Sequence, residues 1–188
     1  MMETKKLANT AKSMSLLTLA LMAAMLLLNM AYWLWPNLTS IEGGLGFGFG
    51  LTDRLVPSLG IDVLAMPWWQ TLGAMVISGL PLLVLALGLY QLYLLFTCYG
   101  RGDYFTVASA LHLGKVGKAV ALWVMLAFIC EPLLSLWLTM TAPPGQRMVS
   151  LSLQPSAFVA LFIAASVVMI ARILGAASEV ADENKQFI

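Results

Sequence analysis

Four long apolar runs, separated by less apolar connections, set the pattern of this chain. They cover about residues 14–35, 69–98, 116–140 and 155–173. Because a helix that crosses a bilayer needs about 20 mostly apolar residues, each run is long enough for one span. The pattern predicts an all-α, polytopic integral membrane protein with four transmembrane helices.

The segments between the runs are too short to form soluble domains. Residues 36–68 make a loop on one side of the membrane, residues 99–115 a polar hairpin on the other, and residues 174–188 a polar tail. We therefore expect a single four-helix transmembrane domain over residues 1–188. The loop contains a Gly-rich stretch with a GxGxG pattern, but no strand–helix unit around it favours a phosphate-binding loop.

The basic residues predict the orientation of the chain. Eight of the ten Lys and Arg residues lie in the N-terminal tail, the hairpin, the start of the third run, the end of the fourth run and the C-terminal tail. The two other connections hold only Arg54 and Arg147. Since cytoplasmic segments of membrane proteins carry the excess of Lys and Arg, we expect both termini and the hairpin to be cytoplasmic.

Composition agrees with a membrane protein. The 188 residues are 61% hydrophobic and 10% charged, which lies outside the range of soluble domains. A net charge of +1 without a basic cluster predicts no direct binding to nucleic acid. The first run, after a tail with three lysines, could also be a signal peptide. Its length and its aromatic ending at residues 32–36 favour an uncleaved helix.

Glu131 is the one carboxylate well inside an apolar run. Counting along the helices places Asn29 and Ser78 at a similar depth, so these residues predict an intramembrane polar layer. Ionisable residues inside a membrane commonly mark a cavity, a relay or a buried partner. Two hypotheses therefore stay open: the layer joins the helices by hydrogen bonds, or Glu131 serves transport.

The fourth run carries small residues at helical spacing, which predicts a helix-packing surface. Its neighbour could be a helix of the same chain or of a second copy in a homo-oligomer. The stripe contains Ala157, Ala160, Ala164, Ala171 and Gly175.

Charged residues near the predicted cytoplasmic face form a candidate docking surface. The hairpin contributes cations and the tail contributes carboxylates, so the tail could close over the hairpin or remain solvated. The single histidine, His112, is expected to be solvated. The docking residues are Arg101, Asp103, Lys115, Lys118, Glu179, Asp182 and Glu183.

The sequence offers no catalytic constellation. No nucleophile–base pair, metal-ligand cluster or pair of carboxylates lies at one depth, so we expect neither an enzyme nor a bound cofactor. Cys98 and Cys130 fall at opposite ends of the membrane thickness and are not expected to form a disulfide.

Two short motifs resemble those of a known family. A Leu- and Tyr-rich helix end precedes Arg101–Asp103 and Phe105–Thr106, and the tail closes with Asp182–Asn184 through Phe187–Ile188. Over roughly its last hundred residues the chain resembles a bacterial four-helix membrane family, domain of unknown function 2975. The resemblance implies no established activity. Some members resemble proteins encoded beside a small helix-turn-helix regulator, which implies membrane-linked regulation.

Two functions follow as hypotheses for a multi-pass protein of the bacterial inner membrane. The first is a non-enzymatic regulator or adaptor, whose hairpin and tail bind a helix-turn-helix regulator or another membrane protein. The second is a small transport or accessory subunit of a membrane complex that works through the polar layer around Glu131. The first is preferred because most of the charged residues lie on the predicted cytoplasmic side.

Overall fold

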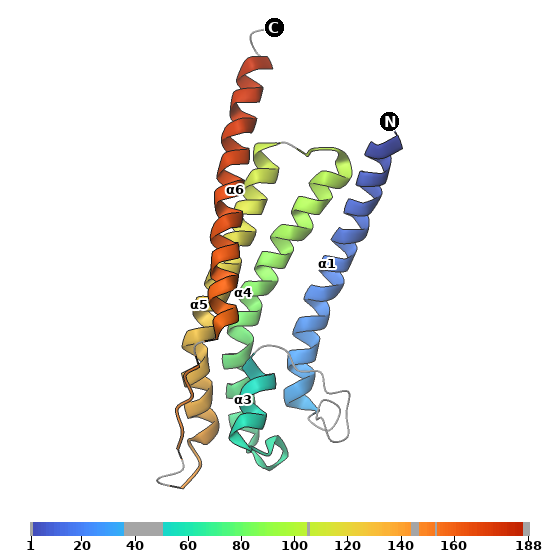
Figure 1. Ribbon diagram of the computed structural model, residues 1–188. Helices are drawn as coiled ribbons and strands as arrows, with labels where there is room; N and C mark the ends of the chain where they lie inside the picture. The colour runs from blue at the N-terminus through green and yellow to red at the C-terminus, as the bar shows by residue number, and fades with distance from the viewer. Residues whose placement is uncertain (1, 36–50, 105, 144–146, 153, 186–188) are drawn as a thin grey trace. The chain divides into compact units, whose positions relative to one another are not determined.

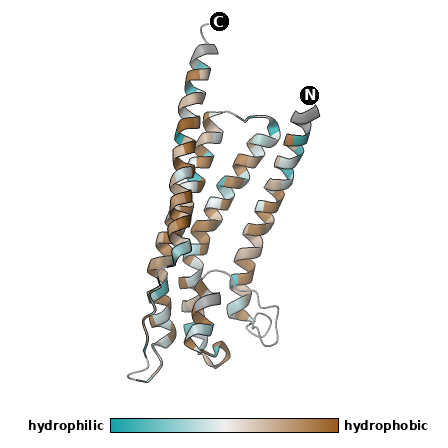
Figure 2. Ribbon diagram, viewed as in Figure 1, coloured by the Kyte–Doolittle hydropathy of each residue, from teal (hydrophilic) through white to brown (hydrophobic). Residues whose placement is uncertain are grey.

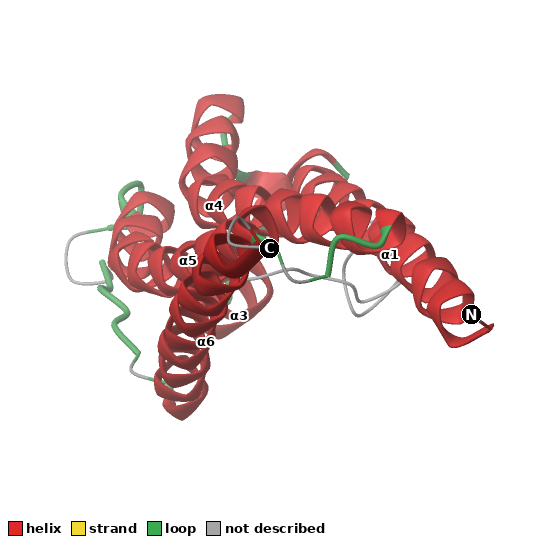
Figure 3. Ribbon diagram, turned by 90° about the horizontal axis from the view of Figure 1, so that it is seen from above, coloured by secondary structure: helices red, strands yellow, loops and turns green. Residues whose placement is uncertain are grey.

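The structure is a computed structural model that describes residues 2–35, 51–104, 106–143, 147–152 and 154–185. Side chains are described for these residues except 2–5, 53–54 and 183–185. Within these ranges the regular structure is helical and contains no strand (Figure 3).

Four long helices account for most of the described chain (Figure 1). They are α1 (Met2–Leu34), α4 (Trp68–Arg101), α5 (Val107–Thr139) and α6 (Pro155–Lys185). Each contains a segment long and apolar enough to cross a membrane, and Figure 2 shows this hydropathy along the ribbons. The predicted all-α architecture with four membrane-crossing helices is therefore confirmed, whereas its orientation stays a prediction.

The helices extend beyond the predicted spans. The turn between α4 and α5 is confined to residues 102–106, inside the predicted hairpin 99–115, and α6 continues through most of the predicted tail. A helix of 33 residues such as α5 is about 50 Å long, whereas the hydrocarbon core of a bilayer is about 30 Å thick. Polarity shows where a helix leaves the lipid, but local caps and turn residues decide where the helix ends.

The connection between α1 and α4 is partly helical. It contains α3 (Leu51–Leu59) and a 3₁₀ turn, η1 (Val63–Ala65), whose N-cap Asp62 accepts a hydrogen bond from the Leu64 amide at 3.0 Å. The Gly-rich stretch that precedes α3 lies outside the described residues.

The chain forms two compact units, each built from parts of several helices. The first unit contains Met1–Met22, Leu85–Leu122 and Pro155–Ile188, and the second contains Ala23–Val84 and Trp123–Gln154. In the second unit, α1, α3, α4 and α5 share an apolar core that includes Trp33, Leu55, Ala74 and Leu134. The expectation of a single domain stays a prediction.

In the first unit, α5 and α6 run antiparallel in close contact. A Cβ built at Gly117 of α5 would lie 2.8 Å from the Ala164 carbonyl oxygen and 2.7 Å from Cγ2 of Val168. Such a distance leaves no room for a side chain, so the α6 backbone approaches α5 directly at this point.

The same contact continues with ordinary spacing along both helices. Cβ positions at Gly114 and Gly175 lie 3.5 Å and 3.7 Å from the Cβ atoms of Ala171 and Ala110. From one contact to the next, the residue numbers rise on α5 and fall on α6, so the two helices run antiparallel.

Candidate functional site

The turn between α4 and α5 begins with a well-formed helix C-terminus. Gly102 has a φ of +96°, a conformation that side-chain-bearing residues rarely adopt. Its amide donates to the Tyr99 carbonyl at 3.1 Å, and the Asp103 amide donates to the Cys98 carbonyl at 3.2 Å. These two bonds form a Schellman motif, which satisfies the last carbonyls of α4 and reverses the chain direction.

The start of α5 is capped with similar regularity. Thr106 accepts a hydrogen bond from the Ser109 amide at 3.2 Å, as an N-cap residue does. The Ser109 hydroxyl donates to the Asp103 carbonyl at 2.9 Å, and the Tyr99 and Tyr104 rings lie 5.9 Å apart. On both sides of the turn, the described residues are therefore held by hydrogen bonds.

Neighbouring helices support the turn from the side. His112 Nδ1 lies 2.8 Å from Gln91 Oε1, which joins α5 to α4. The histidine is half-buried and hydrogen-bonded, so the expectation of a solvated histidine was wrong. A Cβ at Gly100 would lie 3.3 Å from Cγ of Lys12, which shows that α1 lies against the end of α4.

The end of α4, the turn and the first turns of α5 display charged residues and one large apolar side chain. Arg101, Asp103 and Lys115 are exposed, and Leu111 is 60% exposed. Leu111 and Lys115 are four residues apart on α5, so they share one face of the helix. These four exposed residues, Arg101, Asp103, Leu111 and Lys115, are together called the turn surface below.

The remaining candidate docking residues lie further along α5 and α6. Lys118 is exposed on α5, and Glu179 and Asp182 are exposed on the last turns of α6. The Glu183 side chain and residues Phe187–Ile188 lie outside the described part. The first part of the tail is a continuous extension of α6 rather than a separate segment folded over the turn.

The stripe of small residues on α6 faces α5 of the same chain over part of its length. Ala164 and Ala171 are buried there, and Gly175 is half-buried near Ala110. Ala157 and Ala160 are half-buried nearer the start of α6. The matching stripe on α5 was missed in the sequence, although its residues recur at helical spacing: Ala110, Gly114, Gly117 and Ala121.

Two of the three predicted intramembrane polar residues are in direct contact. Ser78 donates to Asn29 Oδ1 at 3.4 Å and accepts from Trp33 Nε1 at 3.0 Å. Thr52 of α3 also donates to Asn29 Oδ1 at 3.3 Å. All four side chains are buried, so this cluster links α1, α3 and α4 within the second unit.

Glu131 is hydrogen-bonded to the segment that precedes α6. Its Oε1 accepts from the Ser152 hydroxyl at 2.6 Å, and Glu131 is only 3% exposed. One turn further along α5, the Ser135 hydroxyl accepts from the Ser150 amide at 2.9 Å. Polar side chains of α5 thus hold this returning segment against the helix.

Gln70 was not predicted from the sequence. It is fully buried, and its amide nitrogen donates at 3.0 Å to the carbonyls of both Trp137 and Leu138. In return, Trp137 Nε1 donates to the Gln70 carbonyl at 2.9 Å. A glutamine two residues into α4 thus satisfies carbonyls at the end of α5, a long-range pairing that no sequence spacing reveals.

Within the described chain, no group of three or more His, Cys, Asp or Glu residues could hold a metal ion. In that same part, every buried side-chain nitrogen and oxygen atom has a hydrogen-bond partner. The buried polar side chains of the described residues are therefore paired within the protein.

Comparison with protein families places the chain. The model of a protein family of unknown function, DUF2975, matches residues 10–188. The chain belongs to the DUF2975 family. This match confirms the resemblance and extends it from the last hundred residues to nearly the whole chain, α1 included. Neither curated proteins nor solved structures give a match.

Proposed function

We propose that this DUF2975 protein is a non-enzymatic regulator or adaptor of the bacterial inner membrane. Its turn surface binds a cytoplasmic partner, and its four long helices anchor that surface to the membrane. The observation that carries the proposal is the turn itself, which is capped on both sides while Leu111 is 60% exposed on the same helix face as Lys115.

The composition of the turn surface fits a protein partner. Protein interfaces commonly combine an apolar centre with a polar rim, and a preordered surface loses little conformational entropy on binding. Leu111 supplies exposed apolar area, Lys115 supplies positive charge on the same face of α5, and Arg101 supplies a second cation at the end of α4. The matching partner is a soluble protein with an acidic face around an apolar pocket, and a small helix-turn-helix regulator is one candidate.

The orientation of the chain supports a cytoplasmic partner. Eight of ten Lys and Arg residues lie in the segments that share a membrane side with the turn if the chain crosses four times. Under the positive-inside rule this side is the cytoplasm. The contacts of Glu131 and Asn29 favour the adaptor over the transport subunit, because these side chains already pair within the protein.

Site-specific photocrosslinking in living cells tests the proposal. A photoreactive phenylalanine analogue is placed at Leu111 and, as a matched control, at Leu122, which is 56% exposed. Leu122 lies 11 residues along α5 on nearly the same face, about 16 Å closer to the membrane interior. We expect a protein adduct at position 111 that is absent at position 122 and greatly reduced by Lys115→Glu.

The adducted protein should also be recovered from the soluble fraction of cells that lack this membrane protein. If position 111 gives no more protein adduct than position 122, or if the adduct is insensitive to Lys115→Glu, the turn surface is not a docking site. A partner recovered only from membranes would instead favour an accessory subunit of a membrane complex.

A further inference from the structure

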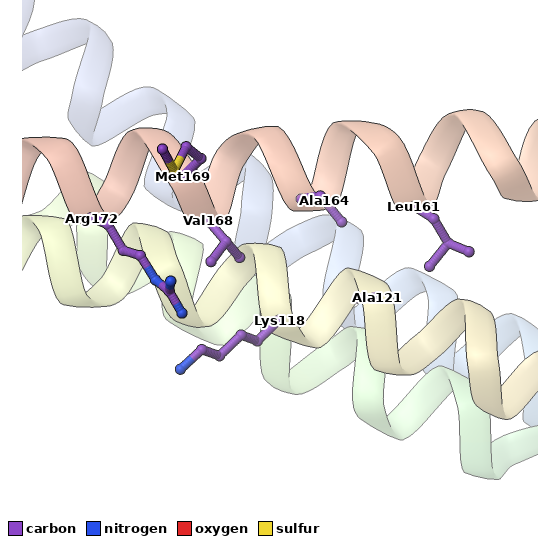
Figure 4. A pocket seen from close by; sticks show the side chains of 8 residues that line it. Lys118, Ala121, Leu161, Ala164, Val168, Met169 and Arg172 are labelled. Atoms are coloured by element: carbon purple, nitrogen blue, oxygen red, sulfur yellow. The ribbon is translucent and has the colours of Figure 1, made fainter.

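An open groove of about 420 Å³ lies between α5 and α6 in the first unit (Figure 4). Small side chains form part of its lining, and Leu161 and Met169 are larger side chains beside them. The groove is adjacent to the close contact at Gly117, because Ala164 and Val168 belong to both. Its residues are Lys118, Ala121, Leu161, Ala164, Ala165, Val168, Met169 and Arg172.

The two charged residues of the groove are both cations. Figure 4 shows the Lys118 and Arg172 side chains extending to the same side, at the end of the groove opposite Leu161. None of the eight lining residues is acidic. Along α6, the next carboxylate, Glu179, follows Arg172 by about two turns. The groove therefore combines an apolar body with a positively charged end.

The lengths of the helices place this charged end at the membrane surface. From Lys118 to Thr139, α5 rises about 32 Å, and from Pro155 to Arg172, α6 rises about 26 Å. Both lengths are close to the thickness of the hydrocarbon core, about 30 Å. If these segments span the bilayer, Lys118 and Arg172 lie at headgroup level, and Ala121, Ala164 and Leu161 lie in the hydrocarbon.

We propose that this groove binds an anionic phospholipid. One acyl chain lies along the apolar lining, and the phosphate is held by the Lys118 ammonium and the Arg172 guanidinium. A lipid is the occupant that matches both parts, because basic pockets between membrane helices suit anionic headgroups and the apolar part of the groove lies at acyl-chain depth. Arginine adds a two-pronged donor set that suits phosphate oxygens. The proposal is independent of the turn surface and its partner.

Lipid binding to the full-length protein in a mild detergent tests this site. The protein is titrated with phosphatidylglycerol and with phosphatidylcholine of the same acyl chains, and bound lipid is counted by native mass spectrometry. We expect one phosphatidylglycerol bound in preference to phosphatidylcholine. In the double variant Lys118→Gln with Arg172→Gln, affinity should fall at least about tenfold, since both charge-assisted contacts are lost.

Matched variants separate the headgroup contact from the acyl-chain contact. Lys115→Gln removes a nearby exposed cation that does not line the groove and should leave binding unchanged. Ala165→Leu fills the groove from an exposed position and should weaken phosphatidylglycerol binding with both cations present. Inorganic phosphate at millimolar concentration should not compete with phosphatidylglycerol for the groove, because it lacks the acyl chain.

Several outcomes would overturn the proposal. Equal binding of the two lipids would show that the cations do not select the headgroup. An equal loss with Lys115→Gln would show a diffuse surface charge effect, and full competition by inorganic phosphate would show an anion site rather than a lipid site. Undiminished binding to Ala165→Leu would place the lipid outside the groove.

Discussion

Polar residues within the second unit act as connectors between elements. Asn29, Ser78, Gln70 and Glu131 are each buried, and each is hydrogen-bonded to another element or to the segment before α6. Burying an unpaired polar group in an apolar environment costs free energy, so buried polar side chains are normally hydrogen-bonded. Their roles are therefore read from the partner atoms, which lie far away in the sequence.

Substitution of Glu131 distinguishes pairing from titration. Glu131→Gln keeps an oxygen that can accept from Ser152, so its thermal stability in detergent should stay within about 1 kcal/mol of the wild type. Glu131→Ala should lose about 1–3 kcal/mol, because the hydrogen bond is lost and a cavity remains.

Ser152→Ala is the matched control for Glu131, because it removes the other partner of the same bond and should reproduce part of the loss. If the Glu131→Gln protein folds but has lost ion-coupled flux or genetic complementation, this result would contradict the structural role and restore the transport hypothesis.

At the scale of elements, glycines mark the places where two helices approach without intervening side chains. Gly117 and Gly114 lie on the same helix and face α6, but only Gly117 lies against the α6 backbone. The two positions therefore form a natural pair for testing the packing of α5 on α6.

Gly117→Ala should destabilise the protein by about 1–3 kcal/mol, since the new methyl group would overlap the Ala164 carbonyl and Val168. Gly114→Ala should be neutral or stabilising by up to about 1 kcal/mol, because its Cβ meets ordinary contacts and alanine favours the helix. Thermal unfolding of both variants in detergent measures the difference. Equal stability of the two variants would mean that α5 and α6 do not pack in this register.

Gly102 tests whether the turn surface depends on its C-terminal helix motif. Its φ of +96° strains any residue with a Cβ, so Gly102→Val should cost more than about 1 kcal/mol. Gly102→Asn should cost less than Gly102→Val, since asparagine tolerates positive φ better. Hydrogen exchange at residues 99–110 measures local opening. The same protection in both variants as in the wild type would show that the turn does not require this conformation.

The four long helices and their apolar centres could be predicted from the sequence, because about 20 apolar residues in a row have few other solutions. The ends of the helices could not be predicted in this way, because α4 and α6 continue as helices through polar residues beyond the apolar runs. The partners of Gln70 and His112 were missed, because each is brought close by packing and not by local spacing.

For the whole molecule, the proposed function depends on which side of the membrane holds the α4–α5 turn. Four crossings would place the start of α1, this turn and the end of α6 on one side, and the positive-inside rule predicts that this side is the cytoplasm. The adaptor hypothesis requires this orientation, because a soluble cytoplasmic partner must reach Leu111 and Lys115.

Cysteine labelling in sealed cells tests this orientation most directly. Leu111→Cys, Val180→Cys and Met148→Cys are introduced singly at exposed positions, in a background carrying Cys98→Ala and Cys130→Ala. With a membrane-impermeant maleimide applied to spheroplasts, we expect Met148→Cys to react at once, and Leu111→Cys and Val180→Cys to react only after the membrane is opened. Labelling of Leu111→Cys in sealed spheroplasts would contradict a cytoplasmic docking surface.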